Sequence, residues 1–274
     1  RLSSAGNLSI FLVILCTSIL QDLTGATFPR TTVINLPRCS SRRQKIINEL
    51  SSKKVEFSWT EAVDGKNMTQ SQLAQNSTAL ASWFMTPGMI GCFLSHRRCW
   101  EQCMKSGKPL LVFEDDVVLG DNFREVVIAA LSRCSEPDLL HEWDVLLLGA
   151  MGCVHPGRKY GLNIIACLVG GRWRKSRHIA DLDFADTGHD TNGSPKSKSL
   201  SFIHTPMCPY GMHAYIITPK GAEKLLKSCP RASYHVDVVG WGRKDLNIFA
   251  VHPLIAHQSN SDTTIGGLVH LWKR

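Results

Sequence analysis

Short apolar segments alternate with amphipathic segments along most of this chain, and this alternation limits the folds that it can adopt. Runs rich in β-branched and aliphatic residues, typical of strands, occur at 31–36, 55–65, 110–116, 143–150, 210–218 and 246–251. Apolar residues at helical spacing occur at 40–54, 86–109, 122–134 and 218–229. Strands that alternate with helices predict an α/β fold on a mainly parallel, doubly wound sheet, which places ligand sites at the carboxyl ends of its strands.

The helix predicted over 86–109 has clear boundary residues. It begins at a Thr-Pro pair, in which Thr86 can cap the helix and Pro87 occupies its first position. Gly107 is expected to end it, directly before the next strand. For the first helix, Ser40 is the predicted N-cap.

The first residues predict a targeting segment. Residues 8–20 form an apolar run without a charge, which is short for a membrane span of roughly 20 residues and fits the apolar part of a signal peptide. Because the first residue is Arg rather than Met, a membrane anchor is the alternative. We therefore expect residues 1–27 to be a signal peptide or an N-terminal membrane anchor, and residues 28–274 to form one folded domain.

Sequons at Asn67, Asn76 and Asn192 permit N-glycosylation if the chain enters the secretory pathway. The ten cysteines give no tidy disulfide framework and no His/Cys cluster with zinc spacing, so most are expected to be small buried apolar residues. These features favour the ER or Golgi lumen as the location. Residues 171–200, rich in Gly, Ser, Asp, Lys and Arg, are predicted to be a long flexible loop, either a binding lid or plain disorder.

Three consecutive carboxylates, Glu114, Asp115 and Asp116, end the aliphatic strand predicted over 110–116. Unpaired charges are costly to bury, and like charges raise one another's pKa. Because side chains alternate along a strand, Glu114 and Asp116 are expected on one face and Asp115 on the other. Two carboxylates on one face can bind Mn²⁺ or Mg²⁺, which commonly also bind phosphate oxygens of a substrate.

Two other interpretations of these acids remain open at this point. The acids can lie at a solvated strand end and cap the helix that starts near Asn122, or the triplet can be a chance cluster. A metal on an α/β sheet also serves nucleotidyl transfer, phosphate ester hydrolysis and glycosyl transfer alike. The chain lacks a GxxxxGK[ST] loop, a GxGxxG turn after a strand and a GxSxG elbow. Their absence narrows the range of possible functions a little.

In their order and spacing over about residues 31–258, the motifs resemble those of glycosyltransferase family 25. This family holds bacterial lipooligosaccharide galactosyltransferases and eukaryotic procollagen galactosyltransferases. The resemblance begins with Asn-Leu-x-Arg in 33–46 and continues with Gly-x-x-Gly-Cys-x-x-Ser-His in 86–101. The remaining matching segments are 62–66, 112–119, 143–149, 210–226, 235–238 and 246–258.

The resemblance implies a GT-A type fold with a Rossmann-like sheet, a UDP-sugar donor, dependence on Mn²⁺ and inversion at the sugar carbon. It places Asp116 first and Glu114 second as metal ligands, and His257 as a residue that completes the metal or diphosphate site. It also places five residues in or near the nucleotide pocket: Asn35, Arg38, Asp64, Ser95 and His96.

Asp237, in the His-Val-Asp-Val segment, is the candidate catalytic base, because inverting transfer needs a group that takes the proton of the attacking hydroxyl. Other roles for it are to hold the acceptor or the water around the metal, or to pair with Arg243 or Lys244 as a structural acid.

Three further residues are expected to be structural. His213 is predicted to be a core histidine, and Arg42 and Arg43 are expected on a solvated helix face, although they could also meet the diphosphate.

The leading hypothesis is therefore a metal-dependent, inverting UDP-sugar glycosyltransferase. Galactose is the expected sugar, and a glycan or a hydroxylysine-type group is the expected acceptor. The alternative is a catalytically silent family relative that binds carbohydrate or protein. The formal charge of +8 suits an acidic ligand or merely basic surface faces. A nucleic-acid partner is not expected, because the basic residues are scattered without interleaved aromatic residues.

Overall fold

The computed structural model describes residues 28–156, 176–184, 201–239 and 245–259. The helices are α2 (Ser40–Ser52), the 3₁₀ helix η1 (Gly65–Asn67), α3 (Gln70–Asn76), α4 (Ala81–Phe84), α5 (Pro87–Ser106), α6 (Phe123–Cys134), α8 (Pro219–Ser228) and α9 (Val236–Val239). The strands are β1 (Arg30–Asn35), β2 (Ser58–Glu61), β3 (Leu110–Glu114), β4 (Val117–Leu119), β5 (Val145–Cys153), β6 (Arg177–Asp181), β7 (Phe202–Thr205), β8 (Cys208–Ile217), β9 (Ile248–His252) and β10 (Ala256–Gln258).

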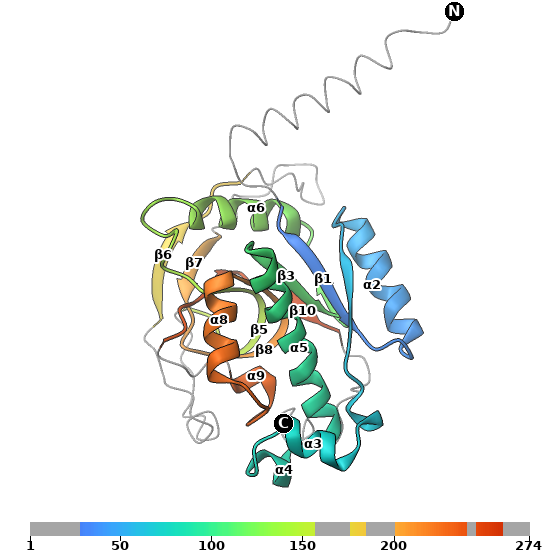
Figure 1. Cartoon of the computed structure of the whole chain (residues 1–274). Coiled ribbons are helices and arrows are strands. Elements are labelled where there is room, and N and C mark those ends of the chain that lie inside the picture. The colour runs from blue at the N-terminus through green and yellow to red at the C-terminus, as the bar shows by residue number, and fades with distance from the viewer. Residues whose placement is uncertain (1–27, 157–175, 185–200, 240–244, 260–274) are drawn as a thin grey trace, which may run out of the picture.

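A large sheet with the strand order β2-β1-β3-β8-β5-β9-β7-β6 forms the centre of the molecule (Figure 1). Strand β1 runs parallel to both β2 and β3, and β5 runs parallel to β9. Strand β8 lies antiparallel between β3 and β5, and β7 is antiparallel to β9 and β6. The predicted α/β, Rossmann-like architecture is confirmed, and its sheet is mixed because β8 and β7 run against the direction of their neighbours.

Helices cover the sheet on both faces, which makes three layers (Figure 1). Along β3, Leu110 and Val112 pack in one apolar core with α5 and α8. Leu111 and Phe113 alternate with them and pack in a second core with α2 and α6. All four side chains are buried, as expected for a strand covered on both faces, which reads in the sequence as a continuous apolar run.

Helix α5 has the predicted boundaries. The Oγ1 of Thr86 accepts a hydrogen bond from the backbone N–H of Met89 at 3.2 Å, and Gly107 adopts a left-handed conformation with φ 62°. The prediction that Ser40 caps α2 is wrong, because the helix begins one residue earlier and Cys39 occupies the cap position without a side-chain hydrogen bond.

Two loop and strand predictions need correction. Residues 177–181, predicted within a long loop, form strand β6 at the sheet edge. Only Ala180 of this strand is buried, so the sequence carries almost no apolar pattern there. Residues 171–175 and 185–200 of the predicted loop lie outside the described residues, as does the predicted targeting segment 1–27. Of the strand predicted over 55–65, only Ser58–Glu61 forms β2.

Two glycines allow the segment before η1 to lie against the first half of α5. A Cβ on Gly65 would lie 1.6 Å from the carbonyl oxygen of Pro87, and one on Gly91 would lie 2.4 Å from that of Val63. These contacts are with backbone atoms, which cannot move aside as a flexible side chain would. The glycines therefore fix the distance between Asp64 and the helix that carries His96.

We expect Gly65→Ala to lower the free energy of unfolding by at least about 1–3 kcal/mol, the usual cost of forcing extra atoms into a packed site. Urea denaturation measures this change. Gly120→Ala is the control, because a Cβ there would lie at an ordinary 3.4 Å from the nearest atom, the carbonyl oxygen of Ile255. Equal stability of the Gly65 and Gly120 variants would contradict the close approach.

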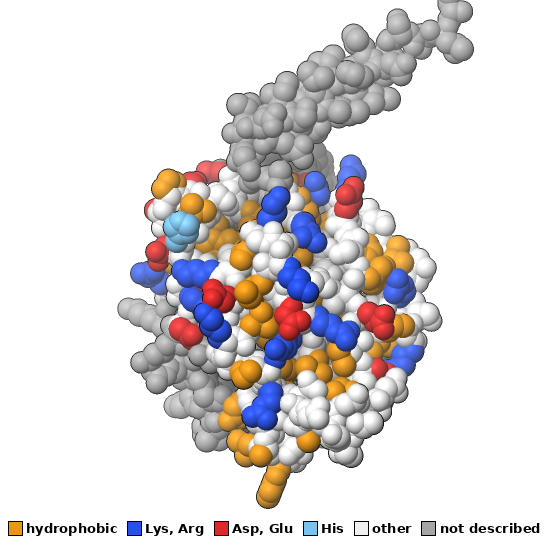
Figure 2. All heavy atoms as spheres, viewed as in Figure 1, with side chains coloured by type: hydrophobic (Ala, Val, Ile, Leu, Met, Phe, Trp, Pro, Cys, Tyr) orange, Lys and Arg blue, Asp and Glu red, His pale blue; other side chains and the backbone are white. Residues whose placement is uncertain are grey.

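The surface in the view of Figure 2 mixes side chains of every kind. Lys and Arg side chains lie among acidic and apolar ones over this face rather than in one block (Figure 2). Within the described residues, each helix is too short or too polar to cross a bilayer.

Candidate active site

A cavity with a volume of about 390 Å³ opens where the carboxyl ends of the parallel strands β1 and β3 meet. Its other walls come from the segment around η1, the first half of α5, α9 and β10. Eight residues predicted for the site line it: Arg38, Asp64, Ser95, His96, Glu114, Asp116, Asp237 and His257. The ninth, Asn35, is buried beneath the cavity floor, where it contacts Asp115.

The three consecutive acids form what we call the acidic turn, residues 114–116. Strand β3 ends at Glu114, and Asp115 and Asp116 form the turn that leads into β4. The expectation of strand alternation through residue 116 is therefore wrong. Since the chain turns here, Asp115 is not directed to the opposite face of the sheet, and all three acids line the cavity.

Asp115 is held by two partners. Its Oδ1 pairs with Nη1 of Arg42 at 2.7 Å, and its Oδ2 accepts a hydrogen bond from Nδ2 of Asn35 at 2.7 Å. Burial raises the pKa of the Asp115 carboxyl, and Arg42 and Asn35 oppose this rise. The expectation of a solvated helix face for both arginines is wrong, because Arg42 points into the cavity and Arg43 lies 3.9 Å over the ring of Trp59.

Asp116 carries charge that its neighbours only partly balance. Its Oδ2 accepts a hydrogen bond from Nε2 of Gln258 at 3.0 Å and lies 3.7 Å from Arg42 Nη2. Its Oδ1 is buried and has no hydrogen-bond partner among the described residues. Burial and the nearby Glu114 raise the pKa of Asp116 to about 7. A buried carboxylate oxygen without a partner is an expected ligand for a cation.

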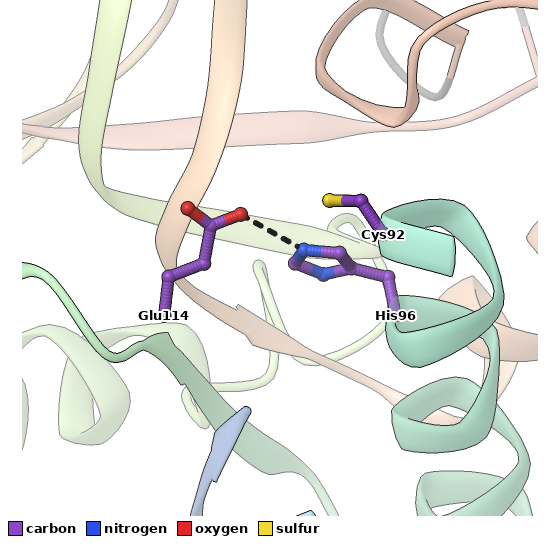
Figure 3. Close-up of side chains that lie close together, drawn as sticks. All are labelled: Cys92, His96 and Glu114. Atoms are coloured by element: carbon purple, nitrogen blue, oxygen red, sulfur yellow. Dashed lines mark hydrogen bonds and ion pairs between the residues drawn. The ribbon is translucent and has the colours of Figure 1, made fainter. Parts of the chain in front are cut away.

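His96 connects the acidic turn to the protein core. Its Nε2 lies 3.1 Å from Oε1 of Glu114, and its Nδ1 lies 3.1 Å from the hydroxyl of Tyr215, which also accepts a hydrogen bond from Trp100 Nε1. Cys92, one helical turn before His96, points toward the same place (Figure 3). The sequence reasoning did not single out Cys92, although its i, i+4 spacing to His96 was the available signal.

Asp237 also lines the cavity, from the short helix α9, with 26% of its side chain exposed. Its Oδ2 is 3.2 Å from Nδ1 of His235. Burial alone would raise the pKa of Asp237, but the charge of His235 and the contact with it hold this pKa below its ordinary value. The alternative partners Arg243 and Lys244 lie outside the described residues.

A second ion pair, between Arg38 and Asp64, lies at the rim of the cavity. Arg38 donates to both carboxylate oxygens of Asp64, at 2.7 and 3.3 Å, and the hydrogen bond from Arg38 lowers the pKa of Asp64. Lys66 follows two residues later and also lines the cavity. The hydroxyl of Ser95 accepts a hydrogen bond from the backbone N–H of Val63 at 2.8 Å, so it holds the rim segment against α5.

His257 reaches the rim because β10 pairs with β4, directly after the acidic turn. Its side chain is exposed, and Glu114, Asp116 and His257 do not gather their ligand atoms within 4.8 Å of one another. His213 is buried in the cavity wall, where burial lowers its pKa.

The cavity thus combines acidic ligands for a cation with Arg42, Arg38 and Lys66, which can face an anion. This pairing suits a ligand that brings a divalent cation and a phosphate group together.

Comparisons with known proteins assign the chain to a family. The family described as Glycosyltransferase family 25 (LPS biosynthesis protein) matches residues 28–239. Inactive glycosyltransferase 25 family member 3 of Mus musculus is 33% identical over 140 residues, which is 47% of this chain and 23% of that protein. Procollagen galactosyltransferase 2 of Homo sapiens is 29% identical over 131 residues, 44% of this chain and 21% of that protein.

A glycosyltransferase 25 family member of Aedes aegypti is 26% identical over 148 residues, 51% of this chain and 24% of that protein. The similarity to this chain spans less than a quarter of the length of each of these relatives. The family match covers most of the chain, including both the acidic turn and Asp237. The chain belongs to glycosyltransferase family 25.

Proposed function

We propose that this chain transfers a sugar from a UDP-sugar to an acceptor hydroxyl, with inversion at the sugar carbon and with Mn²⁺ or Mg²⁺ as cofactor. The observation that carries the proposal is the convergence of the acidic turn and Asp237 on one cavity, at the carboxyl ends of two parallel strands. Nucleotide sites occupy this position in sheets of this kind.

The donor set fits the proposed cofactor. Mn²⁺ and Mg²⁺ prefer carboxylate and phosphate oxygens, and the buried Oδ1 of Asp116 has no other partner among the described residues. Asp116 would hold the ion together with Glu114 and diphosphate oxygens, with His257 at the rim. When bound, the ion supplies positive charge that stabilises the departing UDP. Arg42 adds a fixed positive charge beside the same acids.

Asp237 would act as the base. Its lowered pKa keeps the carboxylate ionised near neutral pH, so it can accept the proton of the acceptor hydroxyl. The hydroxyl oxygen then forms a bond to the sugar carbon while the bond from that carbon to the diphosphate oxygen breaks. The electron pair leaves with UDP, and Asp237 holds the proton.

Replacement of His235 by Gln tests how this base is tuned. Because His235 holds the pKa of Asp237 down, its removal is expected to raise that pKa. The acid limb of the kcat/KM profile should then move to higher pH, since a larger share of Asp237 is protonated at each acidic pH. A pH–rate series on both proteins measures the shift. An unmoved acid limb would separate His235 from the catalytic ionisation.

Galactose is the proposed sugar, because one relative is named a procollagen galactosyltransferase. A glycan hydroxyl and a hydroxylysine-type hydroxyl are the proposed acceptors. Transfer assays with a panel of UDP-sugars and of both acceptor types distinguish among them.

A second candidate function is a silent family member that binds carbohydrate or protein. A relative named inactive, at 33% identity, favours this alternative. Calorimetry of UDP binding with Mn²⁺, set beside a transfer assay, separates the two functions. Binding without turnover on any acceptor supports the silent module, and binding with turnover supports the enzyme.

We also propose that the chain acts in the secretory pathway, where its sequons would be used. Asn67 is exposed at the end of η1, whereas Asn76 is partly buried as a residue and its amide donates to the carbonyl oxygen of Gln72. Expressed with a secretion signal in cultured cells, the protein should lose mass on treatment with a glycosidase that removes N-glycans. Asn67→Gln should remove one glycan. An unchanged glycan number in this variant would contradict the use of Asn67.

A further inference from the structure

Cys92, His96 and Glu114 place a sulfur, a nitrogen and an oxygen ligand together at the cavity wall (Figure 3). We propose that these three residues form a binding site for a thiophilic divalent cation such as Zn²⁺, which shares Glu114 with the oxygen site proposed at Asp116. The fourth coordination position of such a cation would face the cavity, since all three residues line it.

The backbone holds two of the ligands in register. Cys92 and His96 lie one turn apart on α5, an i, i+4 spacing that sets both side chains on the same face of a helix. Glu114 approaches them from the end of β3. A pair on one helix and a third ligand on a neighbouring strand is a rigid frame, because both elements are buried in the core.

The distances are close to those of a bound cation. The three ligand atoms lie within 4.8 Å of one another, and His96 Nε2 is already 3.1 Å from Glu114 Oε1. Metal–ligand bonds of about 2.0–2.3 Å at tetrahedral angles place ligand atoms about 3.5 Å apart. No two of the ligand atoms are therefore more than about 1.3 Å farther apart than around a bound cation.

The second nitrogen of His96 is oriented as in known metal sites. Its Nδ1 meets the hydroxyl of Tyr215, which is fixed in turn by Trp100. A hydrogen bond at Nδ1 directs Nε2 toward the ligand position and fixes the ring. His96, Tyr215 and Trp100 are almost completely buried, so this orientation is built into the core.

The surrounding charge favours a cation. Burial and four carboxylates, those of Glu114, Asp237, Asp116 and Asp115, raise the pKa of the Cys92 thiol well above its ordinary value. The same negative charges stabilise a divalent cation, which displaces the thiol proton when it binds. We therefore expect the site to bind a metal that bonds strongly to sulfur, and we do not expect Cys92 to be a free thiolate without it.

Cobalt absorbance tests the site directly, because a thiolate bound to Co²⁺ gives a charge-transfer band that oxygen and nitrogen ligands do not give. We expect this band in the wild-type protein, its loss in Cys92→Ser, and its retention in Cys39→Ser. Cys39 is the matched control, since it is also a partly buried free cysteine. Circular dichroism shows whether each variant is folded.

Competition with a chelating dye measures the zinc affinity, and so shows how much each residue contributes to binding. Tyr215→Phe should lower the affinity about 10–100-fold, as for other groups that orient a metal ligand, and Cys92→Ser should lower it at least as much. A wild-type protein without the cobalt band overturns the proposal. So does a band that survives in folded Cys92→Ser, or one that disappears equally in Cys39→Ser.

These binding measurements do not depend on the proposed enzyme activity. One consequence does rest on that proposal: a thiophilic cation bound to Glu114 would withdraw this ligand from the ion proposed at Asp116. Zn²⁺ is then expected to inhibit Mn²⁺-dependent transfer, whereas failure of transfer altogether would leave the cobalt result intact.

Discussion

Asp237→Asn is expected to lower the turnover number for sugar transfer by about 10²–10⁴-fold, the usual contribution of a positioned general base. The amide keeps the shape of the carboxylate but cannot take the acceptor proton. UDP affinity should stay nearly unchanged, because the proposed ligands of the metal that binds the diphosphate lie on the acidic turn and not on α9. Initial-rate kinetics and UDP calorimetry on the same samples separate these two effects.

Asp138→Asn is a suitable control for this experiment. Asp138 is also a paired acid, held by Arg133 at 2.8 Å, but it is exposed and is not among the residues that line the cavity. Its substitution should leave transfer near the wild-type rate. If Asp237→Asn also retained that rate, Asp237 would not be the base, and its place beside His235 would be structural.

Asp116→Asn is expected to abolish the effect of Mn²⁺ on UDP binding, with a loss of about 100-fold or more in affinity at saturating metal. The amide keeps one oxygen but removes the negative charge from a buried group whose Oδ1 has no hydrogen-bond partner among the described residues. The variant should fold well without metal, because a buried charge that its neighbours only partly balance has been removed.

The pH dependence of metal binding provides an independent check on this residue. Because the pKa of Asp116 is raised to about 7 without metal, a proton must leave before the cation binds. Below that pH the group is neutral and the metal competes with the proton. Mn²⁺ should therefore raise the melting temperature more at pH 8 than at pH 6. In Asp116→Asn the rise in melting temperature with Mn²⁺ should be small and equal at the two pH values. A large rise at both pH values in this variant would contradict the role of Asp116 as a metal ligand.

The sequence could predict the layered fold because its helices carry strong boundary residues. Thr86 and Pro87 at one end of α5 and Gly107 at the other each act on the nearest helical turn, so their effect can be predicted without tertiary information. Strand β6 could not be predicted, because a short edge strand buries almost nothing and takes its conformation from β7. The antiparallel direction of β8 could not be predicted either, because the pattern of apolar residues is the same for a strand that runs in either direction.

At the site, the sequence predicted residue types better than their contacts. Eight of the nine predicted residues line one cavity, because parallel strands bring their carboxyl ends together. The local turn at Asp115 could not be predicted from alternation, and so its pairing with Arg42 was missed. The position of Cys92 beside Glu114 depends on how α5 crosses β3, which no local pattern encodes.

Metal-dependent sugar transfer from a UDP-sugar is the activity that we propose for the cavity. Its most direct test is UDP release by the purified chain with Mn²⁺, a panel of UDP-sugars, and glycan and hydroxylysine-containing acceptors. We expect acceptor-dependent release, fastest with UDP-galactose, that disappears on chelation and in Asp116→Asn. No release above the buffer rate with any donor, from a protein that is folded and binds UDP, would contradict the claim.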